Sequence, residues 1–234
     1  MRALPLLFLC IMSCSDDNTQ INSAITETPT LLPDSTKATP VSYDKMKTNI
    51  QSYRKALDQP SNKNDYKFLE QCFTSVAVDS IISYWYGTEW DFNGTTQTPG
   101  KGAIACGYFV STVLRDAGLL LNRVKTGQAS AEIIIKQFAD KNDIKAFHNS
   151  SLDTSLAFVK KEGRGLFIVG LDSHVGFLFY DGMNIWFIHS KWVNPKAVVK
   201  EEASQSGILY YSKYRVIGKI SNNKKLLDDW IHSD

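Results

Sequence analysis

The spacing of apolar positions along this chain changes at about residue 164. Before that point they recur every three to four residues, the period of a helix with one buried face. This pattern predicts helices at about 42–57, 66–84, 106–118, 129–138 and 152–161. After that point, short runs of β-branched and aromatic residues are separated by turn residues, which indicates strands. The predicted strands lie at about 164–171, 174–180, 184–189, 197–200 and 209–217, and a last helix lies near 224–231. Helices followed by an antiparallel sheet make an α+β fold.

The N-terminal segment has a different pattern from the rest. Met1-Arg2 precedes an apolar run that is typical of a secretory signal and too short to span a bilayer. Ile11-Met12-Ser13-Cys14 resembles a bacterial lipobox, in which cleavage before the cysteine is coupled to its lipidation. We therefore predict a signal peptide at 1–13, a lipidated Cys14 that begins a disordered Ser/Thr/Asn/Asp/Pro-rich tether at 14–41, and one folded domain at 42–234. The alternative is a plain cleaved signal in which Cys14 is incidental.

Acyl chains on Cys14 would anchor the protein to a membrane surface. Ser15-Asp16-Asp17 resembles an export signal on surface lipoproteins of some Gram-negative bacteria. These features predict a cell-envelope protein that is lipid-anchored to a bacterial membrane, with the outer membrane favoured. They leave open which leaflet carries the protein.

Length and charge restrict the classes of function. A chain of 234 residues that is 43% hydrophobic can form one domain with a sizeable core. A formal net charge of +2 from mixed signs gives no basic field of the kind that nucleic-acid binding needs. The sequence contains no P-loop, no dinucleotide fingerprint and no carboxylate-rich metal loop, so we predict neither a cofactor nor a bound metal. The oligomeric state stays open.

Two cysteines, Cys72 and Cys106, remain in the predicted folded domain. Two are too few to indicate a disulfide framework, although the predicted compartment is oxidising. Cys72 has apolar neighbours at helical spacing and is predicted to be a core residue. Cys106 begins a predicted helix that Gly118 ends. Free N–H groups and the helix dipole favour a thiolate there, so Cys106 is a candidate nucleophile. The alternative is a small, buried and inert residue.

Two of the four histidines are predicted to lie side by side. Asp181-Gly182 between two predicted strands favours a two-residue hairpin turn. His174 and His189 are equally far from that turn along the chain, so they would face each other with Cβ atoms about 5 Å apart. A four-residue loop would shift the partners but keep both on one face, whereas a bulge could separate them. One imidazole could then accept the proton of Cys106 while the other orients it.

Four segments, in order, resemble the NlpC/P60 superfamily of papain-like cell-wall peptidases. The cysteine segment Cys106-Gly-Tyr-Phe-Val is similar to the family's Asp-Cys-Ser-Gly-Phe-Val, and His174-Val-Gly-Phe-Leu is similar to its His-Val-Gly-Ile-Tyr strand. Phe187-Ile-His189-Ser resembles the strand that carries the third catalytic residue, and Tyr84-Trp85-Tyr86-Gly87 resembles a Tyr-x-Trp-Gly element beside the nucleophile. The resemblance implies a papain-like fold in which N-terminal helices, including the nucleophile helix, pack on a C-terminal antiparallel sheet or half-barrel.

The resemblance also implies a function and its residues. Cys106 would be the nucleophile, His174 the base and His189 its orienting partner. Tyr84 and Trp85 would contact substrate. Apart from the resemblance, Asp172 lies two residues before His174 and could bind an amine, with a role in the turn between strands as the favoured alternative; Trp192 could line a groove, with core or rim packing as the alternative. The substrate would be peptidoglycan or a muropeptide, cleaved at an amide bond of the stem peptide.

Two departures from the family pattern flank the cysteine. The family's Asp-Cys-Ser is here Ala105-Cys106-Gly107, so a carboxylate that helps to bind the substrate's amino end is absent. Two alternatives therefore stay open. One is an inactive envelope-binding module with the same fold, and the other is a zinc site made by Cys106, His174 and His189.

Overall fold

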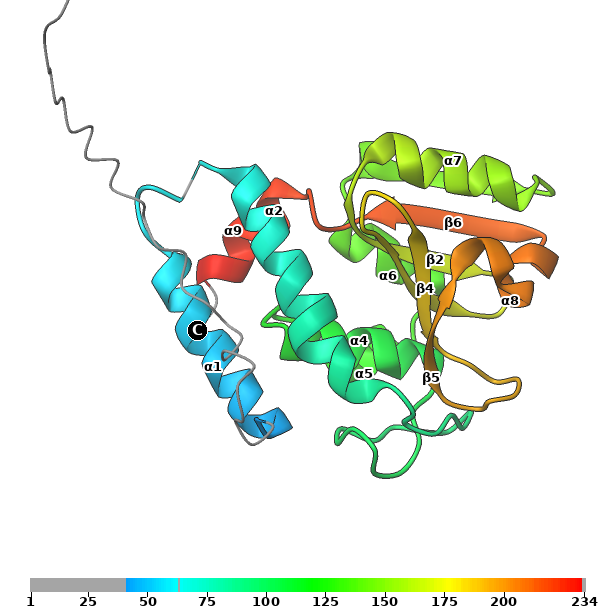
Figure 1. Cartoon of the computed structure of the whole chain (residues 1–234), viewed down its shortest axis with the longest axis horizontal. Coiled ribbons are helices and arrows are strands. Elements are labelled where there is room, and N and C mark those ends of the chain that lie inside the picture. The colour runs from blue at the N-terminus through cyan, green and yellow to red at the C-terminus, as the bar shows by residue number, and fades with distance from the viewer. Residues whose placement is uncertain (1–40, 63, 233–234) are drawn as a thin grey trace, which may run out of the picture.

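The computed structural model describes residues 41–62 and 64–232. Within these ranges the strands form one six-stranded antiparallel sheet with helices on both faces (Figure 1). The strand order is β1-β6-β2-β3-β4-β5. The strands are β1 (Ile144–His148), β2 (Gly165–Leu171), β3 (Val175–Tyr180), β4 (Ile185–Ser190), β5 (Val198–Glu202) and β6 (Tyr214–Lys219). The α+β class and the antiparallel sheet are therefore confirmed.

The helices before the sheet lie close to their predicted positions. The first two begin at a polar cap, where Ser42 Oγ accepts from Lys45 N and Asp65 Oδ1 accepts from Phe68 N. The predicted helix at 66–84 is a continuous helical stretch with a π-helical turn in its middle. The helical elements are α1 (Tyr43–Leu57), α2 (Tyr66–Ser75), the π-helix η1 (Val76–Ile82), α3 (Ser83–Trp85), α4 (Cys106–Asp116), α5 (Arg123–Gly127), α6 (Ala131–Phe138), α7 (Leu152–Glu162), α8 (Gly207–Tyr211), α9 (Lys224–His232) and the short 3-10 turns η2 (Lys141–Asp143) and η3 (Ala203–Gln205).

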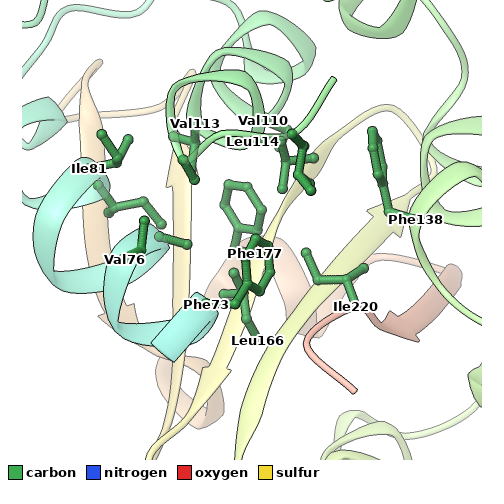
Figure 2. Packing of buried hydrophobic residues seen from close by; sticks show 14 of the residues in the cluster. Phe73, Val76, Ile81, Val110, Val113, Leu114, Phe138, Leu166, Phe177 and Ile220 are labelled. Atoms are coloured by element: carbon green, nitrogen blue, oxygen red, sulfur yellow. The ribbon is translucent and has the colours of Figure 1, made fainter. Parts of the chain in front are cut away.

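The two faces of the sheet bury separate clusters of side chains, because neighbouring residues of a strand point to opposite faces. Leu166 and Ile168 of β2 belong to the cluster that α2, η1 and α4 cover, whereas Phe167 and Val169 belong to the cluster under α7. Figure 2 shows the first cluster, in which Phe177 of β3 lies among side chains from α2, η1 and α4. This packing fixes α4, and with it Cys106, against the sheet.

Three elements differ from the prediction. The edge strand β1 and the short helix α5 were not predicted, and the strand predicted at 209–217 is wrong in its first half. There the chain forms α8 and enters β6 only at Tyr214. Ser206 explains the difference, because its side chain caps α8 by accepting a hydrogen bond from Leu209 N at 3.4 Å. The cap overrides the strand preference of the aromatic residues that follow.

The glycine-containing loop at 88–102 is tied to its surroundings by backbone hydrogen bonds. Ile104 N donates to Glu89 O and Ala105 N donates to Gly94 O, both at 2.8 Å. A Cβ at Gly94 would lie 2.6 Å from the backbone carbonyl carbon of Ala103. The backbones at positions 94 and 103 therefore approach so closely that only glycine fits at position 94. The loop therefore fixes the direction in which the chain enters Cys106.

The predicted signal peptide, the lipidated Cys14 and nearly all of the predicted tether lie outside the described residues. The structure therefore leaves these predictions as they stand. Within the described ranges, no helix is long and apolar enough to cross a membrane.

Candidate active site

Cys106 is the first residue of α4, as predicted. Ala105 before it is extended and takes the N-cap position, and its carbonyl accepts from Phe109 N at 2.8 Å. The buried hydroxyl of Ser190 on β4 donates to Ile104 O at 2.6 Å, which ties the approach to the cysteine onto the sheet. The side chain of Cys106 is half-buried, whereas Cys72 is buried in the core as predicted.

The thiol of Cys106 is surrounded by backbone donors. Burial raises its pKa above the ordinary value, and backbone N–H groups of Val175, Gly107 and Cys106 itself oppose that rise. Burial dominates, so the resting group is a neutral thiol at pH 7. The N–H groups are of the kind that stabilise an oxyanion formed next to the sulfur.

The two histidines meet, although the predicted turn between their strands is wrong. The loop spans the four residues 181–184, closed by a hydrogen bond from Asp181 N to Asn184 O at 3.2 Å. The change displaces the register by two residues, and a displacement by two keeps every side chain on its own face. His174 Nε2 therefore lies 2.8 Å from His189 Nδ1, within hydrogen-bond distance.

The position of the His189 side chain is set by its neighbours on β3 and β4. A Cβ at Gly176 would lie 2.8 Å from His189 Cβ, so a side chain there would displace the histidine. Phe187, two residues away on the same face of β4, stacks on the His189 ring with centroids 3.9 Å apart. Both His189 and His174 are almost completely buried, with 0% and 4% of their surfaces exposed. Their mutual orientation is therefore fixed by packing.

Glu201 is a further member of the group that the sequence did not reveal. It lies on β5 opposite Phe187, which makes it a diagonal neighbour of His189. Its Oε1 is 3.4 Å from His189 Nε2, while Lys191 Nζ lies 2.7 Å from Oε2 and Ser206 Oγ donates to Oε1 at 2.5 Å. Partial burial acts to raise the pKa of Glu201, but these three partners outweigh it and lower the pKa to about 2. The carboxylate is therefore ionised at neutral pH.

An ionised carboxylate at this place selects the tautomers of both histidines. The 3.4 Å contact between His189 Nε2 and Glu201 Oε1 falls outside hydrogen-bond geometry, but a negative charge at this distance favours the His189 tautomer that carries its proton on Nε2 and presents Nδ1 as an acceptor. His174 then carries its proton on Nε2 and donates it to His189 Nδ1. The remaining nitrogen of His174, Nδ1, then carries a lone pair and no proton.

Burial lowers the pKa of both imidazoles. The pKa of His174 lies well below its usual value because the ring is buried and because His189 is close, with Glu201 acting in the opposite direction. The pKa of His189 is lowered by burial and by Lys191, which together outweigh the raising effect of Glu201. Both rings are neutral at pH 7, and a neutral His174 is the form that a general base requires.

Cys106 and His174 line the same cleft, which has a volume of about 640 Å³. Trp192 lies at this cleft as predicted, with its ring edge-on to His174 at a centroid distance of 4.5 Å. The other walls come from the 88–105 loop and from the start of α4 with α5; they include Trp90, Phe92, Asn93, Tyr108 and Gln128. Among the described residues that line this cleft, the ionisable side chains are Cys106, His174 and Tyr108. The wall is aromatic and polar but uncharged.

The predicted substrate contacts at Tyr84 and Trp85 are not at this cleft. Trp85 is fully buried, packs on Phe109, and donates its indole N–H to Tyr43 Oη at 2.9 Å. The Tyr84 hydroxyl donates to Val41 O at 2.5 Å. Trp85 is inaccessible to a substrate, so the prediction for Trp85 is wrong. Tyr84 is partly exposed and is not among the residues that line the cleft of Cys106, so its substrate contact stays a prediction.

Asp172 lies near the site but has a structural role in a turn. Its carboxylate accepts from Ser212 Oγ, Lys213 N and Tyr214 N at 2.7, 2.7 and 3.1 Å. These bonds lower its pKa, with that from Ser212 as the largest cause. Asp172 therefore joins the β2–β3 loop to the start of β6.

The zinc alternative does not fit the arrangement of the side chains. Among the described residues, no group of three or more His, Cys, Asp or Glu side chains is placed to hold a metal ion. His189 directs Nδ1 to His174 and Nε2 to Glu201, so neither nitrogen is directed toward Cys106.

Gly107, one of the two departures beside the cysteine, has a packing explanation. A Cβ at this position would collide with the carbonyl oxygen of Gly127 at the end of α5. The close approach of α5 to α4 therefore excludes a serine at position 107. Position 107 is thus set by the neighbouring helix.

Comparisons of this chain with models of protein families, with curated proteins and with solved structures gave no match.

Proposed function

We propose that this protein is a cysteine hydrolase of the cell envelope that cleaves an amide bond in the stem peptides of peptidoglycan. In this proposal the fold is papain-like, of the NlpC/P60 kind, and a lipid on Cys14 anchors the domain to a membrane. The ordered sequence resemblances support the family, and the geometry around Cys106 supports the chemistry.

One observation carries the proposal more than any other. A cysteine at the start of a helix lines the same cleft as His174, whose far nitrogen is 2.8 Å from His189. A nucleophile, a base and a group that orients the base are the parts that acyl transfer through a thiol requires. Glu201 adds the charge that sets the proton positions in this chain of groups.

The reaction would proceed in two steps. The sulfur of Cys106 bonds to the amide carbon while the thiol proton passes to His174 Nδ1. The carbonyl electron pair moves onto oxygen, where the backbone N–H groups near the thiol stabilise it. The C–N bond then breaks, and the amine leaves with the proton from His174. Water attacks the thioester and gives one proton back through His174, which releases the acid and restores the thiol.

The cleft also bears on which bond is cleaved. Ala105 supplies no carboxylate for the amino end of a substrate, and no Asp or Glu replaces it in the described wall around Cys106. We therefore expect the bond preference to differ from that of family members with an aspartate before the cysteine.

Incubation of the purified full-length protein with defined muropeptides, with products identified by mass spectrometry, tests the proposal. We expect cleavage at one amide bond by the wild-type protein and by Cys72→Ala, which removes the buried cysteine. We expect none by Cys106→Ala. Cleavage that survives Cys106→Ala would exclude the mechanism. A panel in which no substrate is cleaved, with a thiol that alkylates no faster than Cys72, would favour the inactive binding module.

A further inference from the structure

A second hollow adjoins the cleft and shares His174, Ser173 and Trp192 with it. It has a volume of about 410 Å³. Cys106 lines the first hollow and not the second, so His174 and Trp192 separate the second hollow from the thiol. Its outer wall comes from the segment after β4 and from α8.

The proposed reaction determines which part of a substrate lies there. The acyl carbon must lie at the sulfur of Cys106, and the leaving nitrogen must lie at His174, which gives it a proton. The chain beyond that nitrogen then continues past His174, into the hollow on its far side. This step rests on the proposed function. It assigns the second hollow to the amine side of the bond.

The side chains of this hollow offer apolar surface. Tyr211 of α8 is 78% exposed and Val193 of the β4–β5 loop is 42% exposed, and both line it together with Ile208 and Trp192. Large apolar side chains that are exposed beside a concave site indicate a binding surface.

Its two charged side chains already have partners. Lys191 Nζ is 2.7 Å from Glu201 Oε2, and the Asp172 carboxylate accepts three hydrogen bonds from the start of β6 and the residues before it. A charged substrate group would have to compete with these contacts. The hollow therefore favours an apolar group over an ionic one.

We propose that this hollow is the subsite for an apolar side chain on the residue that supplies the leaving amine. Among the residues of a stem peptide the apolar one is alanine, so the enzyme then prefers amide bonds whose amine side is alanine. Leucine and phenylalanine are larger apolar probes of the same hollow. The enzyme disfavours bonds whose amine side is glycine or a charged residue, including a diamino acid. Differences in buried apolar surface of this size give preferences of about tenfold or more.

Two matched variants test the subsite. Tyr211→Ala removes the exposed ring that lines the hollow, whereas Tyr210→Ala removes its equally aromatic neighbour, which is 65% exposed and does not line it. Tyr211→Phe keeps the ring and removes the hydroxyl. Since both tyrosines are exposed, these substitutions leave the core intact.

Binding is measured on full-length Cys106→Ala protein, so that the result does not depend on turnover. The probes are leucinamide, phenylalaninamide, glycinamide and aspartic acid α-amide, followed through the indole N–H signal of Trp192 by NMR. We expect the two apolar amides to bind about tenfold tighter than the other two. We expect Tyr211→Ala to abolish this preference, and Tyr210→Ala and Tyr211→Phe to retain it.

The same preference is then measured as kcat/KM on acyl amides that differ only in the amine-side residue. Equal binding of all four amides, or a preference that survives Tyr211→Ala, overturns the subsite. A preference in binding without turnover of any substrate keeps the subsite and contradicts the hydrolase. Turnover of the substrates without a preference for the amine-side residue supports the hydrolase and overturns the subsite.

Discussion

Glu201→Gln tests the carboxylate charge that sets the proton positions of the two histidines. The substitution keeps the shape of the side chain and removes its charge. A glutamine amide can donate as well as accept, so it no longer forces the proton of His189 onto Nε2. His189 could then donate to His174 through Nδ1, and His174 would carry its own proton on the nitrogen that must accept from Cys106.

The size of the effect follows from the contact that is lost. A hydrogen bond to a charged group contributes about 1.5–3 kcal/mol. The contact of 3.4 Å between His189 Nε2 and Glu201 Oε1 is an ion-pair contact that falls outside hydrogen-bond geometry, so no more than the lower end of that range applies. A cost of about 1.5 kcal/mol in the productive tautomer corresponds to a loss of about tenfold in kcat/KM.

The assay is the pH profile of kcat/KM on a cleaved muropeptide. Glu201 raises the pKa of His174, so we expect its neutralisation to move the acid limb of the profile to lower pH as well as to reduce the plateau. The matched control is Glu202→Gln, whose exposed carboxylate accepts from Ser204 Oγ and lies next to Glu201 in the chain. An unshifted profile with wild-type rates in Glu201→Gln would refute the assigned role.

Three further predictions concern stability, each measured by urea denaturation. Burial depresses the pKa of His174 below 6.5, so at lower pH the unfolded chain binds a proton there that the folded chain does not. The free energy of unfolding should therefore fall as pH decreases below about 6.5. His174→Asn should reduce the difference in the free energy of unfolding between pH 7.5 and pH 5. An unchanged difference would contradict the buried neutral ring. Gly107→Ala should destabilise by about 1–3 kcal/mol through collision with Gly127 O, whereas helix propensity alone predicts a gain; a stabilised variant would contradict that packing. Ser190→Ala should cost about 1–3 kcal/mol by leaving the Ile104 carbonyl without its donor, and a cost near zero would show that this bond does not hold the approach to the cysteine.

The placement of the two histidines on one face could be predicted from sequence because strand alternation tolerates an error of two residues. The predicted two-residue turn is wrong, because the loop between β3 and β4 spans the four residues 181–184. His174 and His189 nevertheless meet, because the register is displaced by an even number of residues. Cys106 could be placed at a helix start because its apolar stripe and Gly118 define both ends of the helix.

Glu201 could not be predicted because its position depends on the register of β5. That register is set by the loop at 191–197, whose geometry no periodic pattern encodes. The family resemblance misplaced Trp85, since an aromatic residue beside a helix end is as compatible with the core as with a binding surface. Its burial against Phe109 depends on how α4 packs on the sheet.

Capture of the acyl-enzyme tests the central claim most directly. A cleaved muropeptide is mixed with the wild-type protein, the reaction is quenched in acid during turnover, and intact and peptide masses are recorded. We expect a mass increase equal to the acyl part of the substrate on the peptide that contains Cys106, and no such adduct in Cys106→Ala. Cleavage of the same bond at an undiminished rate by Cys106→Ala would contradict the account.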